Sequence, residues 1–264
     1  MLRTRVWTAL IALPALLAMV LFAPASWFAA FIAIVTAWGL YEVGAMTGAH
    51  KPAAVLSLLA AGGGSAILLA WAPAHLWPIP LGVTLAMLAL VERVRRGAAA
   101  NETAAARPRP GLMILGGLYV GALFPYFALL RNRSGGVAVT IFVLLLVMAS
   151  DTGAYFAGSK MGRTLLVPRV SPKKTVEGAI GGFILCVVAG LILNQLLVLR
   201  WGTGRTITLS IAIGVLAQVG DLAGSALKRS AGVKDSGWIF PGHGGLIDRT
   251  CSMVFAMVMA YYCA

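Results

Sequence analysis

Residues 178–199 read GAIGGFILCVVAGLILNQLLVL, and this stretch contains no charged side chain. A helix needs about 20 consecutive, mostly apolar residues to cross the hydrocarbon core of a bilayer. The rest of the chain shares this character, because 60% of its 264 residues are hydrophobic and only 11% are charged. Soluble domains carry about 25% charged residues. The sequence therefore predicts an all-α, polytopic membrane protein.

Nine apolar segments are candidates for membrane-spanning helices. They are residues 6–23, 27–46, 53–72, 77–92, 111–130, 136–150, 176–199, 206–223 and 250–264. The first follows Arg3 and Arg5 and could be read as a signal peptide, but a second apolar run starts at Trp27, so we expect a retained span. Pro125 is expected to kink the fifth segment.

The basic segment 93–110 divides these spans into two groups. It ends in Arg107-Pro108-Arg109-Pro110 after an Ala-rich run, a pattern typical of a connecting loop. We expect N-terminal transmembrane helices over residues 1–92, a basic cytoplasmic linker over 93–110 and a C-terminal transmembrane domain over 111–264.

The basic residues between the spans predict the orientation of the chain. With the N-terminus in the cytoplasm, 17 of the 21 Lys and Arg residues fall in cytoplasmic segments, and the other four lie on the opposite side. Such an excess predicts a cytoplasmic N-terminus and cytoplasmic basic loops. Nucleic-acid binding is the competing interpretation of the net charge of +13, but no basic stripe with interleaved aromatic residues supports it.

Five of the eight carboxylates lie at or beside the ends of apolar segments in the second half of the chain. They are Asp151, Glu177, Asp221, Asp235 and Asp248. Ionisable groups near a bilayer are costly and mark functional sites. Here acids, which suit a divalent metal, alternate with Lys, Arg and Gly, which suit phosphate. This pattern predicts phosphoryl-type chemistry in a cytoplasm-facing polar cleft of the C-terminal half.

Two of these acids flank one predicted hairpin. Asp221 ends the eighth span and Asp248 opens the ninth, so the hairpin would bring both carboxylates to one Mg²⁺ ion that also binds phosphate oxygens. The competing interpretation is a pair of salt bridges, from Asp221 to Lys228 and from Asp248 to Arg249. The glycines of residues 241–245 favour the ligand site, because glycine lets a backbone approach a ligand closely.

A second group of polar residues precedes the seventh span. Residues 171–178 read SPKKTVEG, so Lys173 and Lys174 lie just before a predicted helix start, where an anion is favoured. We expect them to hold the phosphates of a nucleotide. Ordinary anchoring of the span by positive charge would also explain the two lysines.

Three kinds of isolated residue are less informative. His243 lies in the glycine run, where a proton relay, hydrogen bonding to substrate and a role in loop structure all remain open. Glu42 is the only acid of the first two spans, and we expect a snorkelling or interhelical partner role for it. The three cysteines form no CxxC pair, so neither a disulfide framework nor a zinc site is expected.

Residues 225–250, SALKRSAGVKDSGWIFPGHGGLIDRT, resemble the signature of the phosphatidate cytidylyltransferase (CDP-diacylglycerol synthase) family. Residues 150–155 and 171–178 resemble further segments of that family, in the same order. The resemblance is specific over about residues 150–252. In the earlier part of the chain it rests only on the number of spans, the basic N-terminal residues and Glu42.

The resemblance implies a site built from both groups of polar residues. The residues expected to be catalytic are Asp221, Lys228, Arg229, Asp235, His243, Asp248 and Arg249, with Asp221 and Asp248 as metal ligands. Those expected to bind the nucleotide are Asp151, Ser171, Lys173, Lys174, Thr175, Glu177, Lys234, Gly244 and Gly245.

The resemblance also implies a reaction in phospholipid biosynthesis. CTP and phosphatidate would give CDP-diacylglycerol and pyrophosphate, with one or two Mg²⁺ ions and room for a monovalent cation. The expected partners are CTP, phosphatidate and membrane lipids, with a homodimer allowed and no nucleic acid. The expected location is the cytoplasmic (inner) membrane, with the active site on the cytoplasmic side.

Two positions depart from the family pattern. The signature ends in an acid where this chain has Cys251, and a Glu usually precedes the signature serine where this chain has Gly224. Because of these departures, a catalytically impaired paralogue of the family is kept as an alternative interpretation. The sequence also leaves open a polyprenol kinase or related lipid-phosphate transferase, an ether-lipid cytidylyltransferase, and a transporter. The intact run from His243 to Arg249 favours the diacyl enzyme, and acids at span ends argue against transport.

Overall fold

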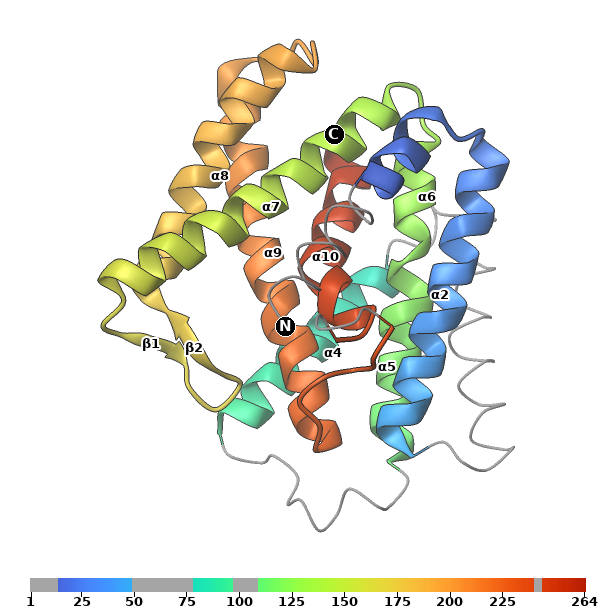
Figure 1. The fold of residues 1–264 in the computed structure, drawn as a ribbon, viewed down its shortest axis with the longest axis vertical. Coiled ribbons are helices and arrows are strands. Elements are labelled where there is room, and N and C mark those ends of the chain that lie inside the picture. The colour runs from blue at the N-terminus through green and yellow to red at the C-terminus, as the bar shows by residue number, and fades with distance from the viewer. Residues whose placement is uncertain (1–13, 49–77, 97–108, 240–243) are drawn as a thin grey trace.

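The computed structural model of the chain describes residues 14–48, 78–96, 109–239 and 244–264, which are mainly helical (Figure 1). The helices are α2 (Ala25–Thr47), α4 (Pro78–Arg95), α5 (Pro110–Leu123), α6 (Pro125–Arg131), α7 (Gly136–Met161), α8 (Val176–Leu196), α9 (Thr203–Ala231) and α10 (Ile247–Cys263). The prediction of a helical membrane protein is confirmed. The description all-α is incomplete, because strands β1 (Leu165–Val167) and β2 (Ser171–Thr175) form an antiparallel hairpin between α7 and α8.

Five described segments are long and apolar enough to cross a membrane: α2, the continuous stretch α5–α6, α7, α8 and α9. The predicted span 53–72 lies outside the described residues, as does part of 6–23. The number nine therefore stays a prediction.

Two helices extend well beyond their predicted ends. We predicted that the sixth span ends at residue 150 and the eighth at 223, but α7 continues to Met161 and α9 to Ala231. In α9 the buried residues Ala223, Ala226, Leu227 and Ala231 keep a spacing of three to four, so the helix still has an apolar stripe to bury. As a result, the acids predicted at span ends, such as Asp221, lie inside helices.

Proline and glycine shape the helices at two places. Helix α5 ends at Leu123 and α6 begins at Pro125, so the helix is interrupted at the expected proline, while Phe124 between them keeps α-helical dihedrals (φ −62°, ψ −35°) and the kink itself stays a prediction. Helices α7 and α8 pack closely through glycines: a Cβ placed on Gly178 would lie 2.8 Å from the carbonyl oxygen of Ala154, and one on Gly182 2.8 Å from that of Ser150. Gly178 and Gly182 are four residues apart, a GxxxG spacing that allows this close packing.

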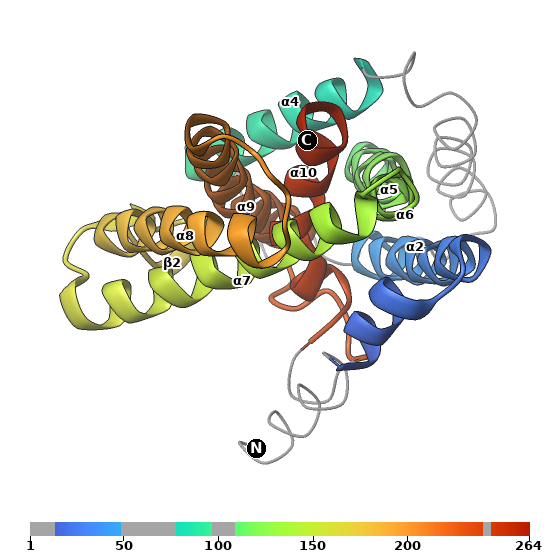
Figure 2. The same ribbon diagram turned by 90° about the horizontal axis from the view of Figure 1, so that it is seen from above.

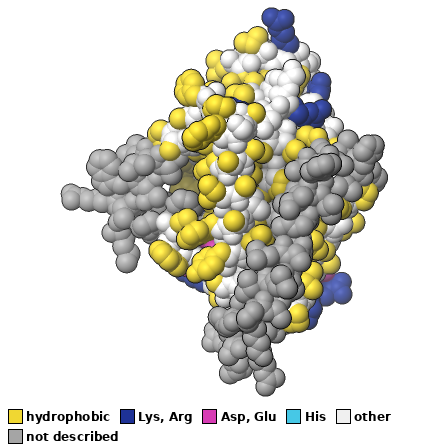
Figure 3. Space-filling model, turned by 90° about the vertical axis from the view of Figure 1, so that its right-hand side faces the viewer, with side chains coloured by type: hydrophobic (Ala, Val, Ile, Leu, Met, Phe, Trp, Pro, Cys, Tyr) yellow, Lys and Arg dark blue, Asp and Glu magenta, His cyan; other side chains and the backbone are white. Residues whose placement is uncertain are grey.

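Helix α10 lies in the middle of the described helices (Figures 1 and 2). Helices α7, α8 and α9 and the β-hairpin lie on one side of it, whereas α2, α5 and α6 lie on the other. Side-chain contacts join the C-terminal ends of α2 and α9 to the start of α10, and they join β2 to α9. The face in Figure 3 carries many hydrophobic side chains, with Lys and Arg near its upper and lower ends, as expected of a membrane-spanning body.

Candidate functional site

One half of the site lies where β2 meets α9. Lys174 in β2 forms an ion pair with Asp221 in α9, with 2.6 Å between the ammonium nitrogen and a carboxylate oxygen. Asp151 of α7 interacts electrostatically with Asp221, Lys174 and Arg249. Two acids and two bases from four different elements therefore face one another.

The other half lies where the end of α9 meets the start of α10. Lys228 forms an ion pair with Asp248, whose side chain is only 6% exposed. The second carboxylate oxygen of Asp248 accepts hydrogen bonds from the backbone N–H groups of Ser236 (2.9 Å) and Gly245 (2.8 Å). Burial acts to raise the pKa of Asp248, but these donors outweigh it and hold the pKa below its ordinary value. Asp248 is thus an anion that fixes Lys228 and the loop around it.

These pairs differ from the salt bridges considered on sequence grounds. The pairing of Asp221 with Lys228 is wrong, because two turns of helix separate their backbones by about 10 Å. Lys174 and Lys228 belong to different elements: Lys174 lies in β2 and pairs with Asp221 of α9, whereas Lys228 lies in α9 and pairs with Asp248 of α10. Each lysine therefore neutralises a different carboxylate.

Cys251 and Gly224, the two departures from the family pattern, contact each other within this cluster. The Cys251 side chain is buried, and its sulfur lies 3.7 Å from a carboxylate oxygen of Asp221. A Cβ added at Gly224 would lie 2.7 Å from the Cβ of Cys251, which is closer than real side chains approach. Any side chain at Gly224 must therefore move Cys251.

The acids suit Mg²⁺ unequally. Among the described residues, no group of three His, Cys, Asp or Glu side chains is placed to hold a metal. Mg²⁺ usually needs only one or two carboxylates, with water and substrate phosphates as its other ligands. The side chain of Asp221 is 37% exposed, so its carboxylate can accept such an ion, and Asp151 is close to it. Asp248 is nearly enclosed and already accepts several hydrogen bonds, so the geometry favours Asp221 over Asp248 as ligand.

Two of the predicted nucleotide-binding residues make structural contacts. The Thr175 hydroxyl accepts a hydrogen bond from the N–H of Gly178 and so caps the start of α8. The Glu177 carboxylate accepts from the backbone N–H groups of Arg163 and Thr164, at 3.1 and 3.2 Å. These two side chains hold the hairpin on α8, which in turn positions Lys174.

The remaining predicted residues lie around the cluster. The side chain of Arg229 donates to the carbonyl of Val233, just past the end of α9. Gly244 adopts a positive φ of 83°, and a Cβ there would lie 2.6 Å from the Asp248 carboxylate, so this close turn requires glycine. The other residues are Lys173, Lys234 and Asp235, which are exposed, Ser171, which is partly buried, and His243, which lies outside the described residues.

Glu42 of α2 contributes to this region in a way that the sequence indicated only in outline. Its side chain is buried, and its carboxylate accepts hydrogen bonds from the N–H groups of Leu246 (2.7 Å) and Ile247 (3.1 Å) and from the hydroxyl of Ser236 (2.7 Å). Glu42 therefore caps the N-terminus of α10 from another helix. This confirms an interhelical role, but which helix it caps could not be read from an isolated acid in an apolar span.

We predict that replacing Glu42 with Gln lowers the stability of the protein. The amide can accept at only one atom, so at least one buried N–H group of α10 loses its acceptor, at a cost of about 1–3 kcal/mol. Thermal unfolding of the purified protein would measure the change in stability. Hydrogen exchange at Leu246 and Ile247 would show where it arises. Unchanged exchange at both amides would contradict the capping role.

Comparisons with known proteins show which sequences the chain resembles. The profile of the cytidylyltransferase family matches residues 3–264. A phosphatidate cytidylyltransferase of Bacillus subtilis is 38% identical over 153 residues, which are 58% of this chain and 57% of that protein. One of Staphylococcus epidermidis is 40% identical over 139 residues, 53% of each chain. The uncharacterised protein YnbB of Escherichia coli K12 is 41% identical over 131 residues, 50% of this chain and 44% of that protein.

The matched stretches span about half the length of these curated relatives. The family profile extends over nearly all of the chain, including α2 with Glu42 and the cluster around Asp221 and Asp248. The chain belongs to the cytidylyltransferase family.

Proposed function

We propose that this protein is a membrane-bound nucleotidyltransferase that moves the cytidylyl group of CTP to phosphatidate, giving CDP-diacylglycerol and pyrophosphate. The observation that carries the proposal is the cluster in which Asp151, Asp221 and Asp248 lie among Lys174, Lys228 and Arg249. The names of the relatives in Bacillus subtilis and Staphylococcus epidermidis supply the substrate class.

The reaction joins two polyanions, so its main obstacle is charge repulsion. An oxygen of the phosphatidate phosphate attacks the α-phosphorus of CTP, a new P–O bond forms, and the bond from the α-phosphorus to the bridging oxygen of pyrophosphate breaks. Lys174 is already held beside Asp221, and we infer that it turns from this carboxylate to the incoming phosphates. Positioning and charge neutralisation by Lys174, Lys228 and Arg249 would lower the barrier.

Asp221, with Asp151 beside it, would hold Mg²⁺ at this site. When bound, the ion supplies positive charge next to the reacting phosphates. Asp248 has a different role in the proposal: it keeps Lys228 in place and fixes Ser236 and Gly245 in the loop before α10. A shared ion between Asp221 and Asp248 stays a prediction.

The site is proposed to open to the cytoplasm at the level of the lipid headgroups. The excess of Lys and Arg in the segments at this end of the helices supports that side. CTP would then arrive from the cytosol and phosphatidate from the bilayer.

The position of a radioactive label distinguishes this reaction from that of a lipid kinase. We expect purified protein in vesicles with phosphatidate to transfer label from α-labelled CTP to the lipid, and to release label from γ-labelled CTP as pyrophosphate. A kinase would instead transfer the γ-label, and transfer of γ-label to lipid would overturn the proposal. A polyprenol or ether-lipid phosphate offered in place of phosphatidate tests the acceptor.

The contact between Gly224 and Cys251 gives a further prediction. Replacing Cys251 with Asp places a hard oxygen ligand close to Asp221, where a thiol now lies 3.7 Å away. We expect the Mg²⁺ concentration for half-maximal activity to fall by about tenfold. Gly224→Glu is the contrasting variant, because its side chain must displace Cys251, and we expect it to lower the unfolding temperature. An unchanged Mg²⁺ titration for Cys251→Asp would show that the thiol position lies outside the metal site.

A further inference from the structure

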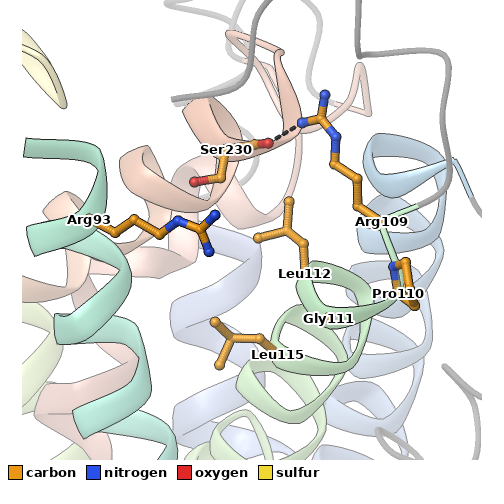
Figure 4. A pocket seen from close by; sticks show the side chains of 7 residues that line it. All are labelled: Arg93, Arg109, Pro110, Gly111, Leu112, Leu115 and Ser230. Atoms are coloured by element: carbon orange, nitrogen blue, oxygen red, sulfur yellow. Dashed lines mark hydrogen bonds between the residues drawn. The ribbon is translucent and has the colours of Figure 1, made fainter. Parts of the chain in front are cut away.

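A cavity lies between α4, α5 and α9, at the end of α9 (Figure 4). Its volume is about 520 Å³, and its lining comprises Arg93, Arg109, Pro110, Gly111, Leu112, Leu115 and Ser230. Arg93 comes from α4 and Ser230 from α9, whereas the others belong to the start of α5 or the residue before it.

This cavity is separate from the cluster around Asp221. Ser230 lies nine residues after Asp221 in the same helix. Nine residues correspond to about 2.5 turns and about 13 Å, so Ser230 faces the opposite side of α9. None of the residues that line the cavity pairs with Lys174, Lys228, Asp221 or Asp248 in the described part of the chain.

Two arginines, Arg93 and Arg109, line the cavity from different helices or helix ends. Figure 4 shows the Arg93 side chain extending from α4 toward Ser230 and Leu112, with Arg109 on the other side. One guanidinium nitrogen of Arg109 donates to the carbonyl of Ser230, and the other, Nη2, is buried with no hydrogen-bond acceptor among the described residues. A buried donor without an acceptor is costly, so this nitrogen favours a ligand oxygen in the cavity.

The start of α5 adds to this preference for an anion. Pro110 occupies the first turn, and the N–H groups of Gly111 and Leu112 have no acceptor within the helix. The N-terminus of a helix also carries partial positive charge. Two guanidinium groups and a helix start therefore surround one cavity, and no acidic side chain lines it among the described residues.

The remaining lining is apolar and leaves room for more than an ion. Leu112 and Leu115 form the part of the cavity that continues along α5 (Figure 4). A Cβ placed on Gly111 would meet no other heavy atom within 4 Å, so the space beside it is open. We propose that this cavity binds the phosphate group of an anionic phospholipid, with Leu112 and Leu115 contacting the apolar part of the same molecule. This site does not depend on the proposed reaction.

A charge-matched pair of variants tests the proposal. Arg93→Gln removes a guanidinium that lines the cavity, whereas Arg96→Gln removes one that is 76% exposed and pairs with Glu92 one turn back on α4. Binding of phosphatidylglycerol to the purified full chain, measured by native mass spectrometry, should weaken about tenfold in Arg93→Gln, the equivalent of one charge-assisted hydrogen bond. It should stay unchanged in Arg96→Gln. An equal loss in both variants would mean diffuse attraction to charge and would overturn the site.

Inorganic phosphate is the second probe. The apolar lining predicts that it binds more weakly than phosphatidylglycerol, and equal affinity for the two would overturn the assignment to a lipid. Gly111→Leu then adds a bulky side chain at a residue that lines the cavity, without changing charge. It should abolish lipid binding while leaving the unfolding temperature the same or higher, because Leu favours a helix more than Gly does. Wild-type lipid binding by Gly111→Leu would also overturn the proposal.

Discussion

Replacing Asp221 with Asn is expected to lower cytidylyl transfer on the order of 10³-fold while the protein stays folded. The carboxylate is partly exposed, and it holds Lys174 and faces Cys251. Its loss removes a charge from the proposed Mg²⁺ site, and the Lys174 ammonium that loses its ion-pair partner still reaches solvent, because its side chain is 26% exposed. The rate is measured as CDP-diacylglycerol formed from CTP and phosphatidate.

A matched acid separates this effect from a general loss of charge. Glu92 of α4 is also partly exposed and pairs with Arg96, away from the cluster. We expect Glu92→Gln to react at the wild-type rate. A near-normal rate for Asp221→Asn, with an unchanged dependence on Mg²⁺, would contradict the role given to Asp221.

Replacing Asp248 with Asn should have a different consequence, because it lowers stability as well as activity. The side chains of Lys228 and Asp248 are 13% and 6% exposed. Removing one member of a buried ion pair leaves the other charge without its partner, which typically costs about 3–5 kcal/mol. The free energy of unfolding, followed by denaturant in a fixed detergent, should fall by about 3 kcal/mol or more.

A double-mutant cycle shows whether the ion pair causes this loss. The single variants Asp248→Asn and Lys228→Gln each leave one buried charge, whereas the double variant leaves none. We therefore expect the double variant to be more stable than Asp248→Asn alone, while its activity stays low. Additive losses of stability would mean that the two side chains act independently, against the contact seen in the structure.

The helices that could be predicted closely are those with an unbroken apolar run. Residues 178–199 indicated α8, whose start at Val176 matches the prediction and whose end at Leu196 falls three residues before it. The extensions of α7 to Met161 and α9 to Ala231 could not be predicted from the length of the apolar run. A helix satisfies its own backbone hydrogen bonds inside or outside the bilayer, so it can continue through polar residues past the end of that run. The β-hairpin was missed because its strands are short, and β2 is rich in Lys, Pro and Ser.

The candidate site could be predicted as a set of residues but not as a set of contacts. The motifs identified Asp221, Lys228 and Asp248 because charged residues in an apolar chain are conspicuous. Which lysine meets which carboxylate depends on how β2, α9 and α10 pack, and so Lys174 with Asp221 was not anticipated.

Two further contacts were beyond sequence reasoning for a similar reason. Glu42 lies about 200 residues from the helix that it caps. Gly224 and Cys251 depart from the family pattern at separate points of the sequence. Only the packing of α9 on α10 shows that the two residues contact each other. Their proximity explains how both can differ together.

The dependence of turnover on Mg²⁺ decides whether this cluster transfers the cytidylyl group with Gly224 and Cys251 in place. The purified wild-type chain is assayed in vesicles with CTP and phosphatidate, first with a chelator and then across a Mg²⁺ titration. We predict no CDP-diacylglycerol with the chelator and saturable formation of it, with equal pyrophosphate, as Mg²⁺ is restored. A folded protein that forms no CDP-diacylglycerol at any Mg²⁺ concentration would contradict the proposed reaction.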